Sequence, residues 1–337
     1  MPIFAIAKEL RYDNMYILKF HEIYKTPIWG GNKIATYKGT QLDYETVGES
    51  WEISAVEGDV SVVANGPDAG MALSELLSRD GAALLGQHVW EHFGTTFPLL
   101  IKFIDACDNL SIQVHPNDEL ARKRHNSFGK TELWYVIDAE EGAGLYSGFS
   151  QAITPEDYVQ CVADNTIMDV LQFHKAQAGD VYFLPSGRVH AIGKGILLAE
   201  IQQTSNITYR IYDYNRVDKE GNPRQLHTEL AQEAIDYKLY DNLKTCYSPC
   251  INQPIQLADC PYFTTNLLHL NSECERLMVA HDSFVIYMCM RGAVTITADN
   301  GASIDLKQGE TCLVPAAISN VVLLPTPEAE LLECYID

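Results

Sequence analysis

The sequence predicts a mainly β fold made of two jelly-roll β units, with a few helices inserted in the first unit. Many short segments rich in β-branched and aromatic residues alternate with Gly and Asn turns, which is typical of double-sheet folds. From residue 261 onward the chain is nearly all β in character. Two stretches, 178–192 (AGDVYFLPSGRVHAI) and 308–322 (QGETCLVPAAISNVV), share a Gly-acid-x-x-x-x-Pro pattern, which indicates two copies of one unit.

A length of 337 residues suits one large domain or two. The stretch SPCINQPI, at 248–255, resembles a linker. We therefore expect an extension over residues 1–14, a first unit with the helices over 15–245, and a second, all-β unit over 246–337.

The expected elements of the first unit follow from periodicity and turn signals. Residues 16–62 read as short strands and turns, and longer strands are expected at 97–106, 110–115, 132–138, 179–184 and 196–203. Helical patterns cover 72–92, 116–125, 154–173 and 227–240. Gly81 is a candidate break in the first helix, Asn117 is the N-cap of the second, and Thr154 with Asp157 forms a capping box for the third.

Charge and cysteine content exclude several classes of protein. A formal net charge of −21 argues against binding to nucleic acid or to an anionic membrane surface. The longest apolar runs are too short to span a bilayer, and the first one, of six residues, is too short for a signal-peptide core. The nine scattered cysteines, an odd number without a Cys-x-x-Cys pair, predict free thiols in a reducing cytoplasm.

The most informative stretch is LSIQVHPND, at 110–118. Side chains alternate between the two faces of a strand, so Ser111, Gln113 and His115 share one face while Ile112 and Val114 face the core. An amide beside an imidazole on one strand face suggests a metal site.

A second motif supports this interpretation. Residues 179–193 (GDVYFLPSGRVHAIG) resemble the second motif of the cupin family, in which a glycine, a Pro-x-Gly turn and a histidine lead into the mouth of the barrel. Gln113 and His115 stand where the cupin His-x-His pair would be, and Glu132 lies on the following strand. Together with His190 they form a nitrogen and oxygen ligand set that suits zinc or another divalent cation.

Each of these residues also has a simpler interpretation. Gln113 alone could be an edge-strand amide, His115 a capping or core histidine, and His190 a residue that closes a turn. The argument for a metal rests on their joint occurrence on three elements of one unit.

Other candidate ligands have less support. His88 and His92 are spaced like a helical metal pair, and Cys246 and Cys250 like half of a zinc site, but neither pair has further ligands nearby in the sequence. In the second repeat, Ala317 and Asn320 replace Gly187 and His190, so we expect the C-terminal unit to bind no metal and to be structural.

Four motifs in order are similar to those of the type I phosphomannose isomerase family, especially its short bacterial form. They are LSIQVHPND, GKTELWYVID, LPSGRVHAIG and EIQQTSNITYRIYDYNR, and IWGG and GESWEIS resemble segments near that family's N-terminus. The resemblance covers residues 15–337 and implies one zinc ion per chain, held by Gln113, His115, Glu132 and His190.

The resemblance also implies the reaction and further site residues. The family interconverts D-mannose 6-phosphate and D-fructose 6-phosphate through a cis-enediol. Lys130, Glu200 and Arg210 match its catalytic residues, and Ser111, Lys130 and Arg210 are candidates for binding substrate. Lys130 could instead be an exposed edge-strand lysine, and Arg210 part of a structural ion pair.

The sequence leaves several questions open. Where the long enzymes read His-Lys-Pro-Glu, this chain reads Gly-Lys-Thr-Glu at 129–132, and Asn206 replaces an aspartate near the arginine. The proton-transferring base therefore stays unassigned between Lys130 and Glu200, and the chain could be a monomer or a homodimer. Rival functions are a cupin isomerase acting on glucose 6-phosphate and a non-catalytic cupin that binds a sugar.

Overall fold

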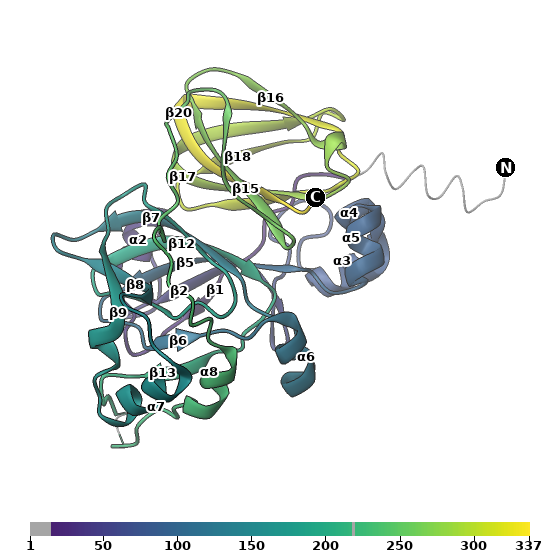
Figure 1. Cartoon of the computed structure of the whole chain (residues 1–337). Coiled ribbons are helices and arrows are strands. Elements are labelled where there is room, and N and C mark those ends of the chain that lie inside the picture. The colour runs from purple at the N-terminus through teal and green to yellow at the C-terminus, as the bar shows by residue number, and fades with distance from the viewer. Residues whose placement is uncertain (1–14, 218–219) are drawn as a thin grey trace.

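The computed structural model describes residues 15–217 and 220–337, so the extension expected over residues 1–14 lies outside the described residues. Two β units are stacked on each other (Figure 1), and strands β1 to β13 form the first while β14 to β20 form the second. The mainly β prediction is confirmed, as is the placement of the helices, because every described α-helix precedes β14. Among the described residues, no helix has the length and apolar character needed to cross a membrane.

The first unit contains two larger antiparallel sheets. One has the strand order β1-β2-β5-β12-β7-β10 and the other the order β13-β6-β11-β8-β9, while β3 and β4 form a separate hairpin. The bounds of the first sheet are β1 Ile23–Lys25, β2 Glu49–Ile53, β5 Leu99–Ala106, β12 Ile196–Gln203, β7 Glu132–Ala139 and β10 Val181–Leu184. Those of the second are β13 Tyr209–Tyr212, β6 Ile112–Val114, β11 His190–Ile192, β8 Gly144–Phe149 and β9 Leu171–Lys175, and the hairpin is β3 Ala55–Val56 with β4 Asp59–Val60.

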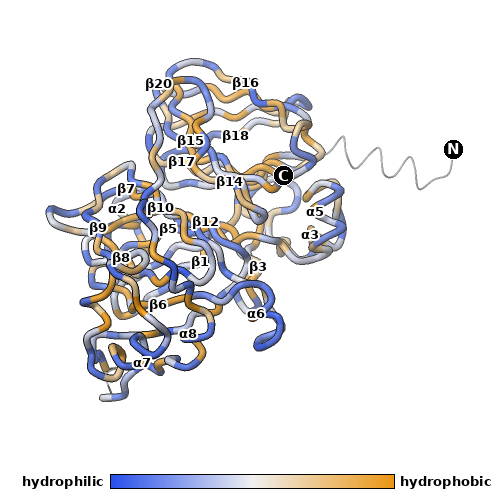
Figure 2. The backbone as a smooth tube through the Cα atoms, viewed as in Figure 1, coloured by the Kyte–Doolittle hydropathy of each residue, from blue (hydrophilic) through white to orange (hydrophobic). Residues whose placement is uncertain are grey.

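Helices lie at the edges of this first unit, with α3, α4 and α5 grouped on one side and α6, α7 and α8 near its far end (Figure 1). Their bounds are α2 Lys33–Lys38, α3 Leu73–Asp80, α4 Ala82–Leu85, α5 Gln87–Phe93, α6 Asp118–His125, α7 Pro155–Ala163 and α8 Thr228–Ala234, with a 3-10 helix η1 at Ile167–Val170. Helix α6 is hydrophilic along most of its length (Figure 2).

The second unit is one antiparallel sheet with the order β14-β15-β20-β17-β18, to which β16 and β19 add through β20 and β17. Its strands are β14 Pro254–Cys260, β15 Phe263–Leu270, β16 Cys274–Leu277, β17 Val285–Ala298, β18 Ser303–Lys307, β19 Thr311–Val314 and β20 Asn320–Tyr335, with a 3-10 helix η2 at Met278–Ala280.

The two repeated sequence stretches adopt the same local structure. Gly179 and Gly309 both have a positive φ, of 86° and 80°, which a residue with a Cβ adopts only at a cost. Each glycine leads into a short strand, β10 or β19, and a turn then connects that strand to the next, β11 or β20. The internal repeat predicted from the sequence is therefore visible in the backbone.

The two units share a hydrophobic core. Phe103 and Ile101 of β5 in the first unit belong to the same buried cluster as Ile286 and Met288 of β17 and Leu332 of β20 in the second. All five side chains are inaccessible to solvent. Because burial of each such side chain stabilises the fold by roughly 1.5–3 kcal/mol, separating the units would expose a large apolar surface.

Several predicted elements need correction. The pattern over 72–92 breaks at Gly81 as expected, but also at Gly86, where φ is 93°. Residues 171–173 are not helical, since they begin strand β9, and α8 ends at Ala234, well before residue 240. Strand β8 was not predicted. The predicted caps are confirmed, because Asn117 accepts a hydrogen bond from the amide of Leu120, and Thr154 and Asp157 form a capping box.

The domain limits at residues 14 and 245 stay predictions, but the shared core predicts how the units unfold. All four tryptophans lie in the first unit, so their fluorescence reports on that unit alone. Leu332→Ala in the shared core and Leu306→Ala inside the second unit should each lower the free energy of unfolding by about 2–5 kcal/mol. We expect both changes to shift a single tryptophan-detected urea transition. A tryptophan transition that Leu306→Ala leaves unmoved would show that the units unfold independently.

Candidate metal centre and active site

One row of side chains crosses the second sheet of the first unit. In the antiparallel register Gln113 of β6 lies opposite Arg210 of β13 on one side and opposite His190 of β11 on the other. Residues directly opposite in antiparallel strands project from the same face of the sheet. The three predicted residues therefore share one face, although their sequence separation is large.

The opposite sheet contributes Glu132, the first residue of β7, and this carboxylate faces the two histidines. His115 Nε2 lies 3.3 Å from Glu132 Oε1, and His190 Nε2 lies 3.4 Å from Glu132 Oε2. Ligand atoms of these three buried residues all lie within 4.8 Å of one another. Gln113 completes the group, because its amide nitrogen is 3.4 Å from His190 Nε2. The four predicted metal ligands are thus brought together.

Hydrogen bonds fix the orientation of both imidazole rings. His115 Nδ1 donates to the carbonyl of Ile207, and His190 Nδ1 donates to the carbonyl of Arg188, each over 2.8 Å. The Nε2 lone pair of each ring then points toward Glu132, which is the arrangement typical of metal-binding histidines. Burial lowers the pKa of His190 and, with the charge of Lys130, lowers that of His115 to about 4.

Glu132 has properties that fit a metal ligand. It is inaccessible to solvent, and the nitrogens that approach its two oxygens are the ammonium of Lys130 and the Nε2 atoms of His115 and His190. Burial alone would raise its pKa, but the charge of Lys130, together with the nearby ring nitrogens of His115 and His190, outweighs burial and holds that pKa well below its ordinary value. A buried anion with free lone pairs, facing two imidazole nitrogens, is suited to a divalent cation.

Lys130 is a buried residue of this site. Only 6% of it is exposed, and its Nζ lies 2.5 Å from Glu132 Oε1 and 3.2 Å from His115 Nε2. It is therefore not the exposed edge-strand lysine of the alternative interpretation. Ser111 is buried too, and it precedes Gln113 by two residues, next to the start of β6.

Glu200 lies on the first sheet and has two close partners. Lys102 Nζ is 3.0 Å from one carboxylate oxygen, and the indole nitrogen of Trp134 donates to the other over 2.8 Å. Lys102 is also 3.4 Å from Glu49. Burial alone would lower the pKa of Lys102, but the two carboxylates outweigh burial and raise that pKa, so the side chain is held as a cation.

Lys102 was missed in the sequence analysis because it lies within the apolar strand FPLLIKFIDA. A single lysine in the middle of an otherwise apolar run was the available signal, since a buried ammonium needs a partner. Trp134 was missed for a similar reason, because an aromatic residue in a strand ordinarily belongs to the core. Its ring also packs edge-on against His190, with ring centroids 5.2 Å apart.

Arg210 is half-buried, and no carboxylate of the described residues forms an ion pair with it. Its Nη1 donates to the carbonyl of Gln225 over 2.9 Å, while its buried Nε has no hydrogen-bond partner in the described part of the chain. The structural ion pair considered as an alternative is therefore absent from the described residues. A guanidinium with free donors beside Gln113 is suited to bind an anionic oxygen.

The other candidate metal ligands from the sequence lie outside this site. His88 approaches Asp282 of the second unit, with its Nδ1 3.3 Å from the carboxylate, and does not form a site with His92. Cys246 and Cys250 are exposed free thiols. Within residues 15–217 and 220–337, His115, Glu132 and His190 form the one group of three or more His, Cys, Asp or Glu residues spaced to hold a metal. That the C-terminal unit binds no metal stays a prediction.

Two family models match the chain. The model described as phosphomannose isomerase type I, catalytic domain, matches residues 17–142, and the model described as mannose-6-phosphate isomerase, cupin domain, matches residues 255–326.

Relatives match over most of their length. A mannose-6-phosphate isomerase of Streptococcus mutans is 35% identical over 294 residues, which cover 87% of this chain and 90% of that protein. A mannose-6-phosphate isomerase of Bacillus subtilis is 38% identical over 265 residues, covering 75% and 79%.

Solved structures agree with these matches. The crystal structure of the mannose 6-phosphate isomerase from Bacillus subtilis superposes with a TM-score of 0.86 at 31% identity, covering 96% of this chain and all of that one. A mutant phosphomannose isomerase from Salmonella typhimurium superposes with a TM-score of 0.78, covering 96% of this chain and all of that one, and at 17% identity this likeness concerns the fold alone.

The buried charges around Lys102 give a stability prediction. Lys102→Met leaves Glu200 and Glu49 without their common cation, so the free energy of unfolding should fall by about 3–5 kcal/mol. Lys175→Met, at an exposed position, serves as the control and should change it by less than about 0.5 kcal/mol. Urea unfolding of both variants measures this. If both variants lost the same small amount of unfolding free energy, Lys102 would not be needed to compensate the charges of Glu200 and Glu49.

Proposed function

The chain belongs to the type I phosphomannose isomerase family, and we propose that it interconverts D-mannose 6-phosphate and D-fructose 6-phosphate as a zinc-dependent isomerase. The observation that carries the proposal is the convergence of four side chains, in which the Nε2 atoms of His115 and His190 and the amide of Gln113 lie beside the carboxylate of Glu132. We further propose that it acts in the cytoplasm, because all nine cysteines are free thiols.

The residues fit a zinc ion. Two neutral imidazoles and one carboxylate supply three ligands, and rotation of the Gln113 amide about its terminal bond would present its oxygen as the fourth. Because the set carries a single negative charge, a bound divalent ion would keep a net positive charge and supply Lewis acidity at the sugar oxygens.

The proposed reaction requires the transfer of two protons. Isomerisation transfers one proton between C1 and C2 of the sugar and another between O1 and O2, through a cis-enediol. One side chain must therefore remove a carbon-bound proton and return it to the neighbouring carbon. Lys130 and Glu200 are the two candidates, and both are buried. Lys130 lies beside Glu132, and Glu200 lies on strand β12 of the same sheet as Glu132.

Positive charge would stabilise the oxygen that becomes negative as the carbon-bound proton leaves. Lys102 is held protonated by Glu200 and Glu49, so we assign it a fixed positive charge and not the role of the base. Arg210, with its unpartnered Nε, is proposed to bind either this oxygen or the phosphate, and Ser111 is proposed to contact substrate.

Metal dependence is the first test of this function. In a coupled assay on mannose 6-phosphate the purified chain should turn over substrate, lose activity with a chelator and regain it with zinc, and contain about one zinc per chain. His190→Ala should lose both the metal and the activity, whereas His174→Ala, on the edge strand β9 of the same sheet, should keep both. Chelator-insensitive turnover would contradict the zinc proposal, and turnover of glucose 6-phosphate alone would contradict the substrate.

Solvent isotope exchange identifies the base. Removal of the base should lower kcat by about 10²–10⁴-fold and abolish exchange of the sugar C1 and C2 protons with deuterated water. We expect Lys130→Ala or Glu200→Gln, but not both, to lose exchange while keeping zinc. Lys123→Ala, an exposed lysine of α6, is the matched control. Normal exchange in both site variants would show that neither residue is the base.

A further inference from the structure

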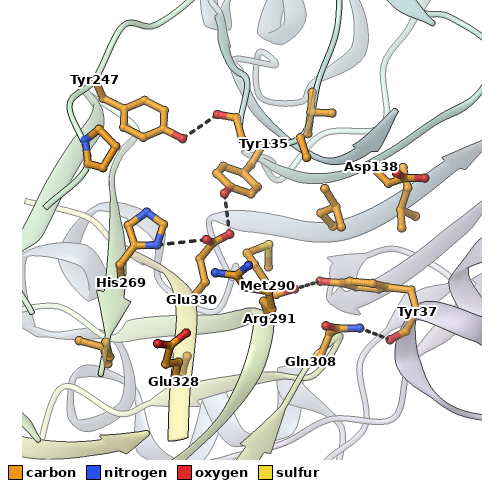
Figure 3. Close-up of a pocket in the computed structure, with 18 of the residues that line it drawn as sticks. Tyr37, Tyr135, Asp138, Tyr247, His269, Met290, Arg291, Gln308, Glu328 and Glu330 are labelled. Carbon is orange, nitrogen blue, oxygen red and sulfur yellow. Dashed lines mark hydrogen bonds and ion pairs between the residues drawn. The ribbon is translucent and has the colours of Figure 1, made fainter. Parts of the chain in front are cut away.

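One well-formed cavity of the described residues lies away from the metal centre. It has a volume of about 910 Å³ and lies between the two units, where α2 and β7 of the first face β15, β17 and β20 of the second (Figure 3). None of the residues proposed for metal binding or catalysis lines it. Its volume is near the upper end of the roughly 300–1,000 Å³ typical of small-molecule pockets, which often form at domain interfaces.

The floor of this cleft is one row of side chains across three strands. Glu330 of β20 lies opposite His269 of β15 on one side and opposite Arg291 of β17 on the other. The two oxygens of Glu330 are already engaged, by the hydroxyl of Tyr135 over 2.6 Å and by His269 Nδ1 at 3.1 Å. Tyr135 belongs to β7 of the first unit, so a residue of the first unit contacts this row.

This leaves two charged groups free to meet a ligand. No ion pair or hydrogen bond joins the guanidinium of Arg291 to another described residue, because the neighbouring carboxylate of Glu330 is engaged elsewhere. The carboxylate of Glu328, two residues before Glu330 on the same face of β20, also has no partner in the described part of the chain. Figure 3 shows both side chains at the cavity without a dashed contact.

The remaining walls combine aromatic rings with amides. Tyr37, Tyr135 and Tyr247 present apolar ring faces, and the hydroxyls of Tyr37 and Tyr247 are bonded to the carbonyls of Met290 and Gly179. The amide of Asn32 makes no capping bond to α2 although it stands at that helix's N-terminus. Donors, acceptors and flat apolar surfaces thus alternate around the cleft.

Charge decides the class of ligand. The lining carries two fixed positive groups, Lys33 and Arg291, and three carboxylates, Asp138, Glu328 and Glu330. Lys33 is paired with Asp138 at 3.0 Å, and the whole chain has a net charge of −21. A phosphate or carboxylate would therefore meet repulsion here, whereas a neutral molecule with many hydroxyls can use the guanidinium, the carboxylate and the amides at once.

We propose that this cleft is a second ligand site, which binds a neutral, unphosphorylated mono- or disaccharide. Arg291 and Glu328 hydrogen-bond its hydroxyls, and the C–H faces of its ring pack on the tyrosines. The C-terminal unit then has a function of its own, since it supplies the polar floor of the site. The proposal is independent of the isomerase activity.

Two cysteines allow the site to be tested with an internal control. Cys250 lines the cleft and is exposed, while Cys107 is exposed and does not line it. Iodoacetamide labelling of each thiol would be followed by peptide mass spectrometry during titrations with D-mannose, D-glucose and cellobiose. At about ten times the Kd of a sugar that binds, the site is nine-tenths occupied, and labelling of Cys250 should slow by about tenfold while that of Cys107 does not change.

Variants and anionic probes complete the experiment. Arg291→Ala and Glu328→Ala should each remove the protection of Cys250 and keep isomerase activity, and Arg122→Ala, an exposed residue of α6, should keep both. The proposal is overturned if none of the three sugars slows labelling of Cys250, if protection persists in Arg291→Ala, or if inorganic phosphate protects better than every neutral sugar. Isomerase activity is measured separately on the same samples, so failure of the sugar site and failure of the proposed function are distinguishable.

Discussion

The site depends on one buried carboxylate, that of Glu132, which is the first residue of β7 and is inaccessible to solvent. An isolated carboxylate in such a place would be strongly destabilising, so it requires compensating charge. His115, His190 and Lys130 surround it within 3.4 Å. These three side chains come from separate places in the chain and meet at the carboxylate that needs them. The same buried negative charge makes the site suited to a cation.

The scaffold around Glu132 restricts how far these groups can move. One sheet carries Arg210, Gln113 and His190 in a single row, and the other carries Glu132 next to the Glu200–Lys102 pair. The first sheet, which carries Glu132, packs its other face on the C-terminal unit through a common core. The C-terminal unit thus supports the sheet that bears the carboxylate of Glu132, and it also forms part of the cleft between the units.

Local sequence pattern and family resemblance were sufficient to predict which residues come together around Glu132. Strand alternation placed Gln113 and His115 on one face, and the Pro-x-Gly turn placed His190 at the start of β11. Lys102, Trp134 and the cleft could not be found in this way. Whether Lys102 meets Glu200 depends on the register between β5 and β12, and the cleft exists only once segments near residues 37, 135 and 330 assemble. The helix wrongly extended into β9 reflects the same limit, because pairing with β8 decided its structure.

The most direct test of this account is the coordination of zinc in the isolated protein, measured by X-ray absorption at the zinc edge. Ligation by Gln113, His115, Glu132 and His190 predicts a first shell of nitrogen and oxygen only, at about 2.0–2.2 Å, with the outer-shell signal of two imidazoles. A sulfur shell at about 2.3 Å would contradict the account, since it would place the metal on cysteines such as Cys246 and Cys250.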